Sequence, residues 1–288
     1  MRTKSHIVPV VVYLLLSIGL LGLALLGWQA VQEARAYERV TQQLIEQLGA
    51  EDRLHSSSKQ WLETLTGGLY SGYSEQLEQW HSLKTAQEQH RQGADQRLWG
   101  FLLLSFLLIL TQWWLRRSWA EMAYVLLLIS ALALAVGLSA PILSISLRAD
   151  LPVLGETVLQ FESKGVLSTL LALQASGNAW LALLLGLFSL VLPACKTLIT
   201  GLTLFASTHA WSLKGLKLVQ HLGKWSMADV FVVAILVAFF AHHEGKLTHT
   251  EVQIGLYFFA LYVLLSLIAT QIIAARFKQP PSLPSSMA

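Results

Sequence analysis

The sequence predicts an all-α polytopic membrane protein with six transmembrane helices. Hydrophobic residues make up 54% of the 288 residues, charged residues only 13%, and the mean hydropathy is +0.54. Soluble domains carry about 25% charged residues, so this composition excludes an ordinary soluble domain. The six apolar runs are Ile7–Trp28, Leu98–Leu115, Trp119–Leu143, Ala179–Phe205, Ala228–Ala241 and Ile254–Ala275.

The first and fifth apolar runs need separate comment. Residues 7–28 approximate the ~20 residues that span a bilayer, and no small-residue cleavage site clearly follows them. We therefore expect a retained membrane anchor. Residues 228–241 are short for a span, and we expect Trp225 to Met227 to extend this helix across the membrane.

Lysine and arginine are distributed unevenly among the short connecting segments. With a cytoplasmic N-terminus, the inner segments carry Arg2, Lys4, Arg116, Arg117, Lys214, Lys217, Lys224, Arg276 and Lys278. The short outer loops carry only Arg148, Lys164 and Lys246. Because cytoplasmic loops are enriched in Lys and Arg, we expect both termini to be cytoplasmic.

The long first loop, residues 29–97, predicts an extracytoplasmic helical hairpin between the first two membrane helices. Apolar residues recur at helical spacing in both of its halves, as at Val31, Ala34 and Leu77. A run of serines and glycines in the middle supplies turn chemistry. The alternative is a flexible polar loop, which the regular apolar spacing disfavours.

The rest of the chain divides into a membrane domain and a tail. Apolar and polar residues alternate within 142–147, which is typical of a short strand. We expect three parts: residues 1–118, with the anchor, the hairpin and the second helix; residues 119–278, a four-helix membrane domain; and residues 279–288, a disordered tail rich in Pro and Ser.

Several function classes find no support in the sequence. The formal net charge of +3 is small and dispersed, so nucleic-acid binding is not expected, and the single Cys195 excludes an intrachain disulfide. We find no nucleophile–base pair, phosphate loop or apolar carboxylate pair, and we therefore expect neither an enzyme nor a cofactor. The outer turn HHEGKLTHTE is interpreted as interfacial polar residues rather than a metal site, because adjacent histidines cannot share one helix face.

Lys196 is the most informative single residue, because it lies well inside the fourth apolar run. A lysine in hydrocarbon costs about 2.5–3.5 kcal/mol on insertion scales, so such residues usually face protein, water or an anionic partner. Ser189, Pro193, Lys196, Thr200 and Thr203 recur at steps of four, three, four and three, which places them on one helix face. Pro193 removes the backbone hydrogen bond to Ser189 and predicts a kink. The alternative is a lysine that extends to the inner headgroups.

The segment GKWSMADVF, residues 223–231, opens the fifth apolar run. Lys224 and Trp225 have the character of interfacial anchors. Ser226 can cap the following helix, and Asp229 falls in its first turn, where the helix dipole favours a negative charge. Asp229 could instead pair with Lys196 or Lys224, which would form a gate-like contact between the fourth and fifth helices.

Three motifs resemble those of a known family. They are APILSIS at residues 140–146, LFSLVLPACK ending at Lys196, and KWSMADVFVVAILVA from Lys224. Together they make residues 119–275 similar to the integral-membrane domain of the paraquat-inducible protein A family. The resemblance singles out six residues: Pro193, Lys196, Trp225, Ser226, Asp229 and Phe231.

The resemblance implies a role in lipid traffic in the envelope of a Gram-negative bacterium. It implies a multi-pass inner-membrane protein, with residues 29–97 in the periplasm, that hands phospholipid to or from an MCE-domain protein. Members of the family typically carry two membrane modules, each preceded by a zinc ribbon with paired cysteines. This chain has one module and no cysteine pair, so a homodimer could restore a two-module arrangement.

Two other functions stay open. A sensor or regulatory protein could use the outer hairpin as its input domain, although the inner loops leave no room for an output domain. A scaffold for an MCE assembly would have no lipid path of its own, and Pro193 and Lys196 would then be unimportant for function.

Overall fold

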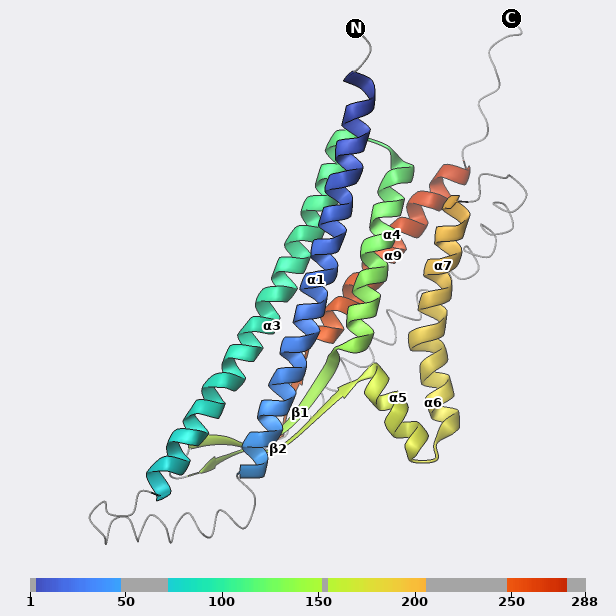
Figure 1. Ribbon diagram of the computed structural model, residues 1–288. Helices are drawn as coiled ribbons and strands as arrows, with labels where there is room; N and C mark the ends of the chain where they lie inside the picture. The colour runs from blue at the N-terminus through green and yellow to red at the C-terminus, as the bar shows by residue number, and fades with distance from the viewer. Residues whose placement is uncertain (1–3, 48–71, 152–154, 206–247, 279–288) are drawn as a thin grey trace, which may run out of the picture.

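The computed structural model describes residues 4–47, 72–151, 155–205 and 248–278. The chain forms an elongated bundle of helices with a small sheet near one end (Figure 1). The elements in order are α1 (Lys4–Gln47), α3 (Gly72–Arg116), α4 (Trp119–Ser139), β1 (Pro141–Leu151), β2 (Gly155–Gly165), α5 (Val166–Ala175), α6 (Ala179–Gly186), the π-helical turn η1 (Leu187–Val191), α7 (Leu192–Phe205), β3 (Thr248–Val252) and α9 (Ile254–Lys278).

Five helical stretches in the described part of the chain are long and apolar enough to cross a membrane. They are Val12–Glu46, Glu78–Arg116, Trp119–Ser139, Ala179–Thr203 and Ile254–Ala275. These five coincide with five of the six predicted membrane segments. The sixth, residues 228–241, lies outside the described residues, so the count of six stays a prediction.

Helices α1 and α3 pack side by side and continue beyond their predicted membrane segments (Figure 1). They contain 44 and 45 residues, where ~20 residues suffice for a span. The residues that connect them, 48–71, lie outside the described residues, and the location of this pair relative to the membrane stays a prediction. The start of α1 and the end of α9 lie at the same end of the molecule, opposite the sheet (Figure 1).

The core of the bundle is built around α4 and α9, with α1 and α3 packed against them. Gly137 allows α4 and α9 to approach closely, because a Cβ atom there would lie 2.9 Å from the backbone nitrogen of Phe259. The ring of Phe258 meets that of Phe101 edge to face at 5.0 Å, which joins α9 to α3. The family-like part of the chain and its N-terminal helix pair therefore share one hydrophobic core.

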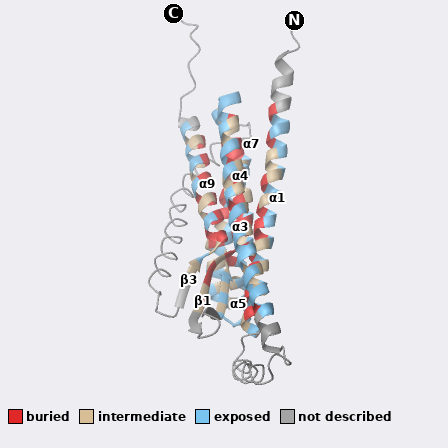
Figure 2. Cartoon of the chain, turned by 90° about the vertical axis from the view of Figure 1, so that its left-hand side faces the viewer, coloured by how far each residue is buried: buried red, intermediate tan, exposed pale blue. Residues whose placement is uncertain are grey.

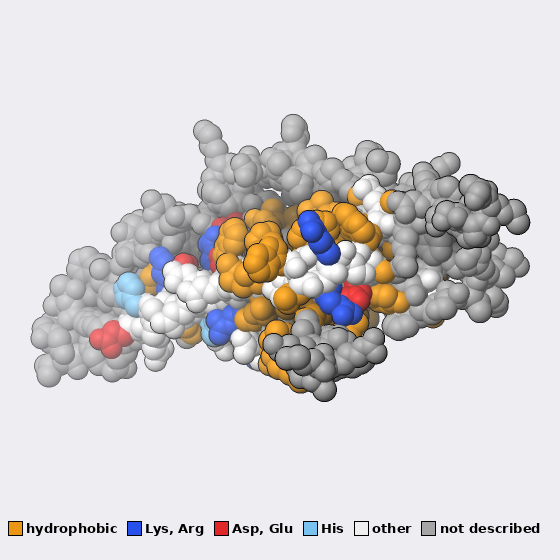
Figure 3. Space-filling view, turned by 90° about the horizontal axis from the view of Figure 1, so that it is seen from above, with side chains coloured by type: hydrophobic (Ala, Val, Ile, Leu, Met, Phe, Trp, Pro, Cys, Tyr) orange, Lys and Arg blue, Asp and Glu red, His pale blue; other side chains and the backbone are white. Residues whose placement is uncertain are grey.

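The outward-facing sides of the helices expose large apolar residues, as expected in lipid. Figure 2 shows exposed residues along these sides and buried residues between the helices. Examples from the five helices are Leu21, Leu103, Leu128, Leu183 and Leu264, all more than half exposed except Leu128 at 48%. Seen from above, apolar side chains surround a small number of charged ones (Figure 3).

A three-stranded antiparallel sheet of order β2-β1-β3 lies beside the C-terminal part of α1 and the N-terminal part of α3 (Figure 1). The predicted strand at 142–147 is confirmed as part of β1. The pairing of β1 with β3, in which Ser144 lies opposite Glu251, joins residues more than 100 positions apart in the chain. The side chain of Gln253 strengthens this connection by donating to the hydroxyl of Ser144 at 2.8 Å. The protein is thus mostly helical, as predicted, with a sheet at one end.

Candidate functional site

The segment from Ala179 to Phe205 is one helical path interrupted by a π-helical turn. The turn η1 occupies Leu187–Val191, directly before Pro193. Because proline has no N–H group, the carbonyl of Ser189 loses its usual helical donor, and a π-helical turn is a common local adjustment to such a loss. The irregularity therefore occurs where the sequence predicted a kink.

The residues of the predicted polar face of this segment are buried, whereas most of its leucines are exposed. Ser189, Lys196, Thr200 and Thr203 are at most 9% exposed, and Pro193 is fully buried. On the other sides of the helix, Leu198 and Leu202 are more than 60% exposed. The five residues that the spacing assigned to one face therefore lie together against the interior. We call them the polar stripe.

Lys196 is the centre of the polar stripe. Its Nζ atom lies 3.2 Å from the hydroxyl oxygen of Ser266 on α9, to which it donates a buried hydrogen bond. One turn away, the hydroxyl of Tyr262 donates to the carbonyl oxygen of Pro193 at 3.1 Å. Both bonds link α7 to α9 through side chains, so the cationic group is held within the bundle rather than extended toward either end of the helix.

The threonines of the polar stripe use their hydroxyl hydrogens within their own helix. Thr200 donates to the carbonyl of Lys196 and Thr203 to that of Thr200, each at 2.7 Å. A donating hydroxyl keeps its oxygen lone pairs as acceptors. The stripe therefore combines one ammonium group with several hydroxyl oxygens on a face otherwise surrounded by apolar helices.

The polar residues of α9 that complete the site were not predicted from the sequence. Tyr262, Ser266 and Thr270 recur every four residues, which places them on one face of α9. Tyr262 and Ser266 are at most 2% exposed. This periodicity is the signal that could have identified them, but neither hydroxyl is unusual in a membrane helix when considered alone.

The second predicted group of site residues cannot be placed. Lys224, Trp225, Ser226, Asp229 and Phe231 lie outside the described residues. The choice between Asp229 as a helix cap and Asp229 as a partner of Lys196 or Lys224 therefore stays open.

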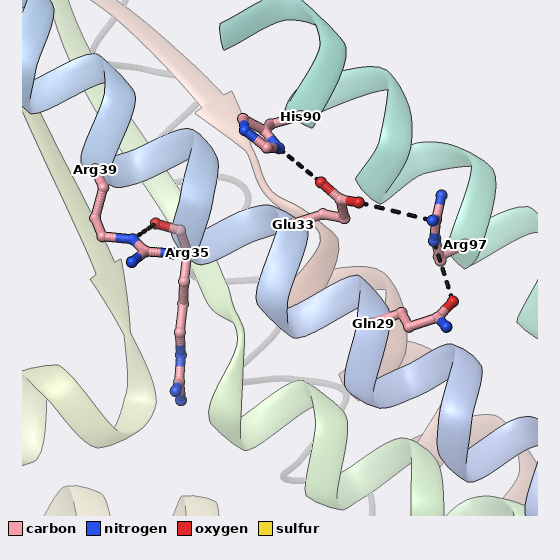
Figure 4. Close-up of polar contacts among 6 residues, drawn as sticks. All are labelled: Gln29, Glu33, Arg35, Arg39, His90 and Arg97. Atoms are coloured by element: carbon pink, nitrogen blue, oxygen red, sulfur yellow. Dashed lines mark hydrogen bonds and ion pairs between the residues drawn. The ribbon is translucent and has the colours of Figure 1, made fainter. Parts of the chain in front are cut away.

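A further polar cluster joins α1 to α3, as Figure 4 shows. The carboxylate of Glu33 lies 2.7 Å from Nδ1 of His90 and 3.7 Å from a terminal nitrogen of Arg97. Arg97 also donates to the side-chain oxygen of Gln29 at 3.3 Å. These contacts fix the register of the two helices. Within the described ranges, no group of three His, Cys, Asp or Glu side chains is placed to hold a metal ion.

The family to which the chain belongs follows from comparison with known proteins. Neither the comparison with curated proteins nor that with solved structures gives a match. The sequence model of the family described as Paraquat-inducible protein A matches residues 120–277, which is more than half of the chain. That range contains the polar stripe, its partners on α9 and the sheet. The chain is a multi-pass membrane protein and belongs to the paraquat-inducible protein A family.

Proposed function

We propose that the protein is an inner-membrane subunit of an envelope lipid-trafficking system and hands phospholipid to or from an MCE-type periplasmic partner. The observation that carries the proposal is the burial of Lys196, 4% exposed, beside the hydroxyls of the polar stripe. A cation held at this depth is expensive, and in membrane proteins such residues mark substrate and ion pathways. Family membership supports the same assignment.

The polar stripe has the chemistry to accept a phospholipid headgroup. The ammonium group of Lys196 attracts the phosphate, and the hydroxyls of Thr200 and Ser266 line the route on either side of it. The exposed leucines of the same helix leave the acyl chains in contact with the bilayer. Asp229 would balance or gate the lysine. The sequence has no nucleotide-binding motif, so energy comes from a partner or a gradient.

The turn before Pro193 gives this path a place to change shape. π-Helical turns are rare, occur mostly as single turns inside α-helices, and are frequent at functional sites. Leu187–Val191 lies between two regular helical pieces, α6 and α7. In this proposal, bending at the turn would move α6 relative to α7, while Lys196, which follows the turn, would keep its contact with Ser266.

The test is substitution of Lys196 in cells that depend on the protein. Lys196→Ala should weaken the envelope, measured as sensitivity to detergent, while the protein is present at its normal level. Lys196→Arg, which keeps the charge, should retain part of the function. Lys164→Ala is the matched control, because that lysine is 47% exposed and pairs with Glu162 on the sheet. Full function in Lys196→Ala would remove the lysine from the proposed path.

A sensor is the alternative, favoured by one feature. Helices α1 and α3 are continuous from the bundle to the region of the sheet and are joined by the Glu33 cluster, so a change at one end can reach the other. Deletion of residues 31–95 separates the two functions. It should abolish a sensor, whereas a lipid path built on the polar stripe should retain partial activity.

A further inference from the structure

A cavity of about 160 Å³ lies between the N-terminal helix pair and the first turn of α9. A single water needs only ~10–15 Å³ in the same measure, so this space accepts a small organic group. Its polar lining comes from four elements and consists of Tyr37, Arg91, Asp95, Glu251, Gln253 and Tyr257. It is separate from the polar stripe and includes α1 and α3, which lie outside the family match.

The cavity lies at the level where the helices leave the membrane. Trp28 and Trp99 are 62% and 70% exposed, and exposed tryptophans are typical of a membrane–water boundary. They lie at one level, because their near neighbours Gln29 and Arg97 are hydrogen-bonded to each other. Asp95 comes four residues before Trp99 in α3, which corresponds to about 6 Å along the helix axis. The lining therefore occupies the headgroup layer just outside the aromatic residues.

The lining offers one cationic group and two anionic groups, which can contact the two ends of a zwitterion. One guanidinium group and two carboxylates, from Arg91, Asp95 and Glu251, give a net charge of −1. Arg91 and Glu251 form an ion pair at 3.6 Å, and the side chain of Arg91 is half exposed. Its planar donor group is suited to a phosphate. The two carboxylates, with the rings of Tyr37 and Tyr257, suit an ammonium group.

We propose that this cavity binds a zwitterionic phosphoethanolamine group, with its ammonium between Asp95 and Glu251 and its phosphate at Arg91. The headgroup of phosphatidylethanolamine is the source we favour, because the cavity opens in the headgroup layer and Tyr257 is 54% exposed at its edge. An anionic headgroup without an ammonium group would face an excess of negative charge and bind less well.

The site would hold a lipid at the junction between the helix pair and the family domain. It gives the N-terminal helices, which the family match does not include, a role in selecting the lipid. The inference does not depend on Lys196: loss of function in Lys196 variants and loss of headgroup preference in cavity variants are separate measurements. Either expectation can prove wrong while the other holds.

The experiment uses the full-length protein in nanodiscs that contain equal amounts of phosphatidylethanolamine and phosphatidylglycerol. Native mass spectrometry then measures which lipids stay bound after release into detergent. The wild type should retain the ethanolamine lipid preferentially. The double substitution Asp95→Asn, Glu251→Gln should reduce that preference about tenfold, the effect expected for losing a charge-assisted hydrogen bond. Glu88→Gln, at an exposed position of α3 that does not line the cavity, should leave it unchanged.

Soluble glycerophosphoethanolamine, a phosphodiester with the same charges as the lipid headgroup, distinguishes the two sources of the ligand. Failure of millimolar glycerophosphoethanolamine to displace the lipid identifies a lipid site, whereas displacement shows that a free zwitterion uses the same charges. If the double variant does not fold, wild-type protein is crosslinked with phosphatidylethanolamine carrying a photoreactive headgroup, and the label should map to peptides containing Tyr37 or Tyr257. Equal retention of both lipids by the wild type, an unchanged preference in the folded double variant, or labelling only elsewhere would overturn the proposal.

Discussion

Lys196 of α7 donates a buried hydrogen bond to the hydroxyl of Ser266 on α9, across 3.2 Å. The two residues are 70 positions apart in the chain. Ser266 also donates to the carbonyl of Val263 in its own helix, so its oxygen remains the acceptor for the ammonium group. The contact fixes the lysine against α9, which packs closely on α4.

Ser266→Ala should destabilise the protein by about 1.5–3 kcal/mol, because a buried ammonium group loses a hydrogen-bond acceptor. Ser130→Ala is the matched control. Ser130 is also buried, and its hydroxyl likewise donates to a carbonyl three residues earlier in the helix. Thermal unfolding in detergent compares the two, and we expect the control to lose less than about 1 kcal/mol. Equal losses would show that the contact with Lys196 contributes nothing to stability.

Gly137→Ala should separate α4 from α9. The added Cβ would lie 2.9 Å from the backbone nitrogen of Phe259 and 3.2 Å from the carbonyl oxygen of Gly255, and backbone atoms cannot move aside easily. Overpacking of this kind costs about 1–3 kcal/mol. In Gly100→Ala, on α3, the nearest atom is a leucine methyl at 3.7 Å, so this variant should gain up to about 1 kcal/mol from helix propensity. Melting temperatures that move in the same direction would contradict the close approach.

Glu33→Gln should loosen the pairing of α1 with α3. The substitution leaves His90 and Arg97 without their shared carboxylate, and for a partly exposed cluster the cost is about 1 kcal/mol. Hydrogen exchange should become faster in the C-terminal half of α1 and the N-terminal half of α3, which lie beside the sheet. Glu46→Gln, at an exposed position of α1, is the control and should leave exchange unchanged. Unaltered exchange in Glu33→Gln would mean that apolar packing alone determines the register.

Glu121→Ala should lower the melting temperature by removing the partner of Arg116. Glu121 accepts two hydrogen bonds from that guanidinium group, at 2.5 and 2.7 Å, and one from Gln112 at 3.0 Å. The pair joins the end of α3 to the start of α4. The exchanged pair Arg116→Glu, Glu121→Arg should recover part of the lost stability, measured by the same thermal unfolding. No recovery would indicate that the geometry of the wild-type pair, rather than the attraction of the charges, is what matters.

Local signals in the sequence identified most of the helical segments correctly. Apolar runs of about 20 residues can satisfy their backbone only as helices in a membrane, and five of the six predicted segments are helices in the structure. The position of the irregularity before Pro193 followed from the missing N–H of proline, and the strand at 142–147 from its alternation. Each of these inferences depends on residues within a few positions of one another.

Contacts between distant segments could not be predicted in this way. Nothing in the alternation of β1 indicates that its second partner is Thr248–Val252, and nothing near Glu33 identifies His90 and Arg97 as its partners. Strand pairing and helix register depend on which surfaces fit together when the whole chain packs. The cavity beside Arg91 and Glu251 exists only because four elements meet there.

The sequence by itself determined that this protein spans a membrane, which family it belongs to, and that Lys196 shares one helix face with four other residues. These properties follow from composition and helical periodicity, which are local. The tertiary structure decided that this face is buried, that Ser266 and Tyr262 complete it, and that a charged cavity forms between the N-terminal helix pair and the start of α9. Those properties depend on the packing of α1, α3, α7 and α9, which brings together side chains that the chain itself keeps far apart.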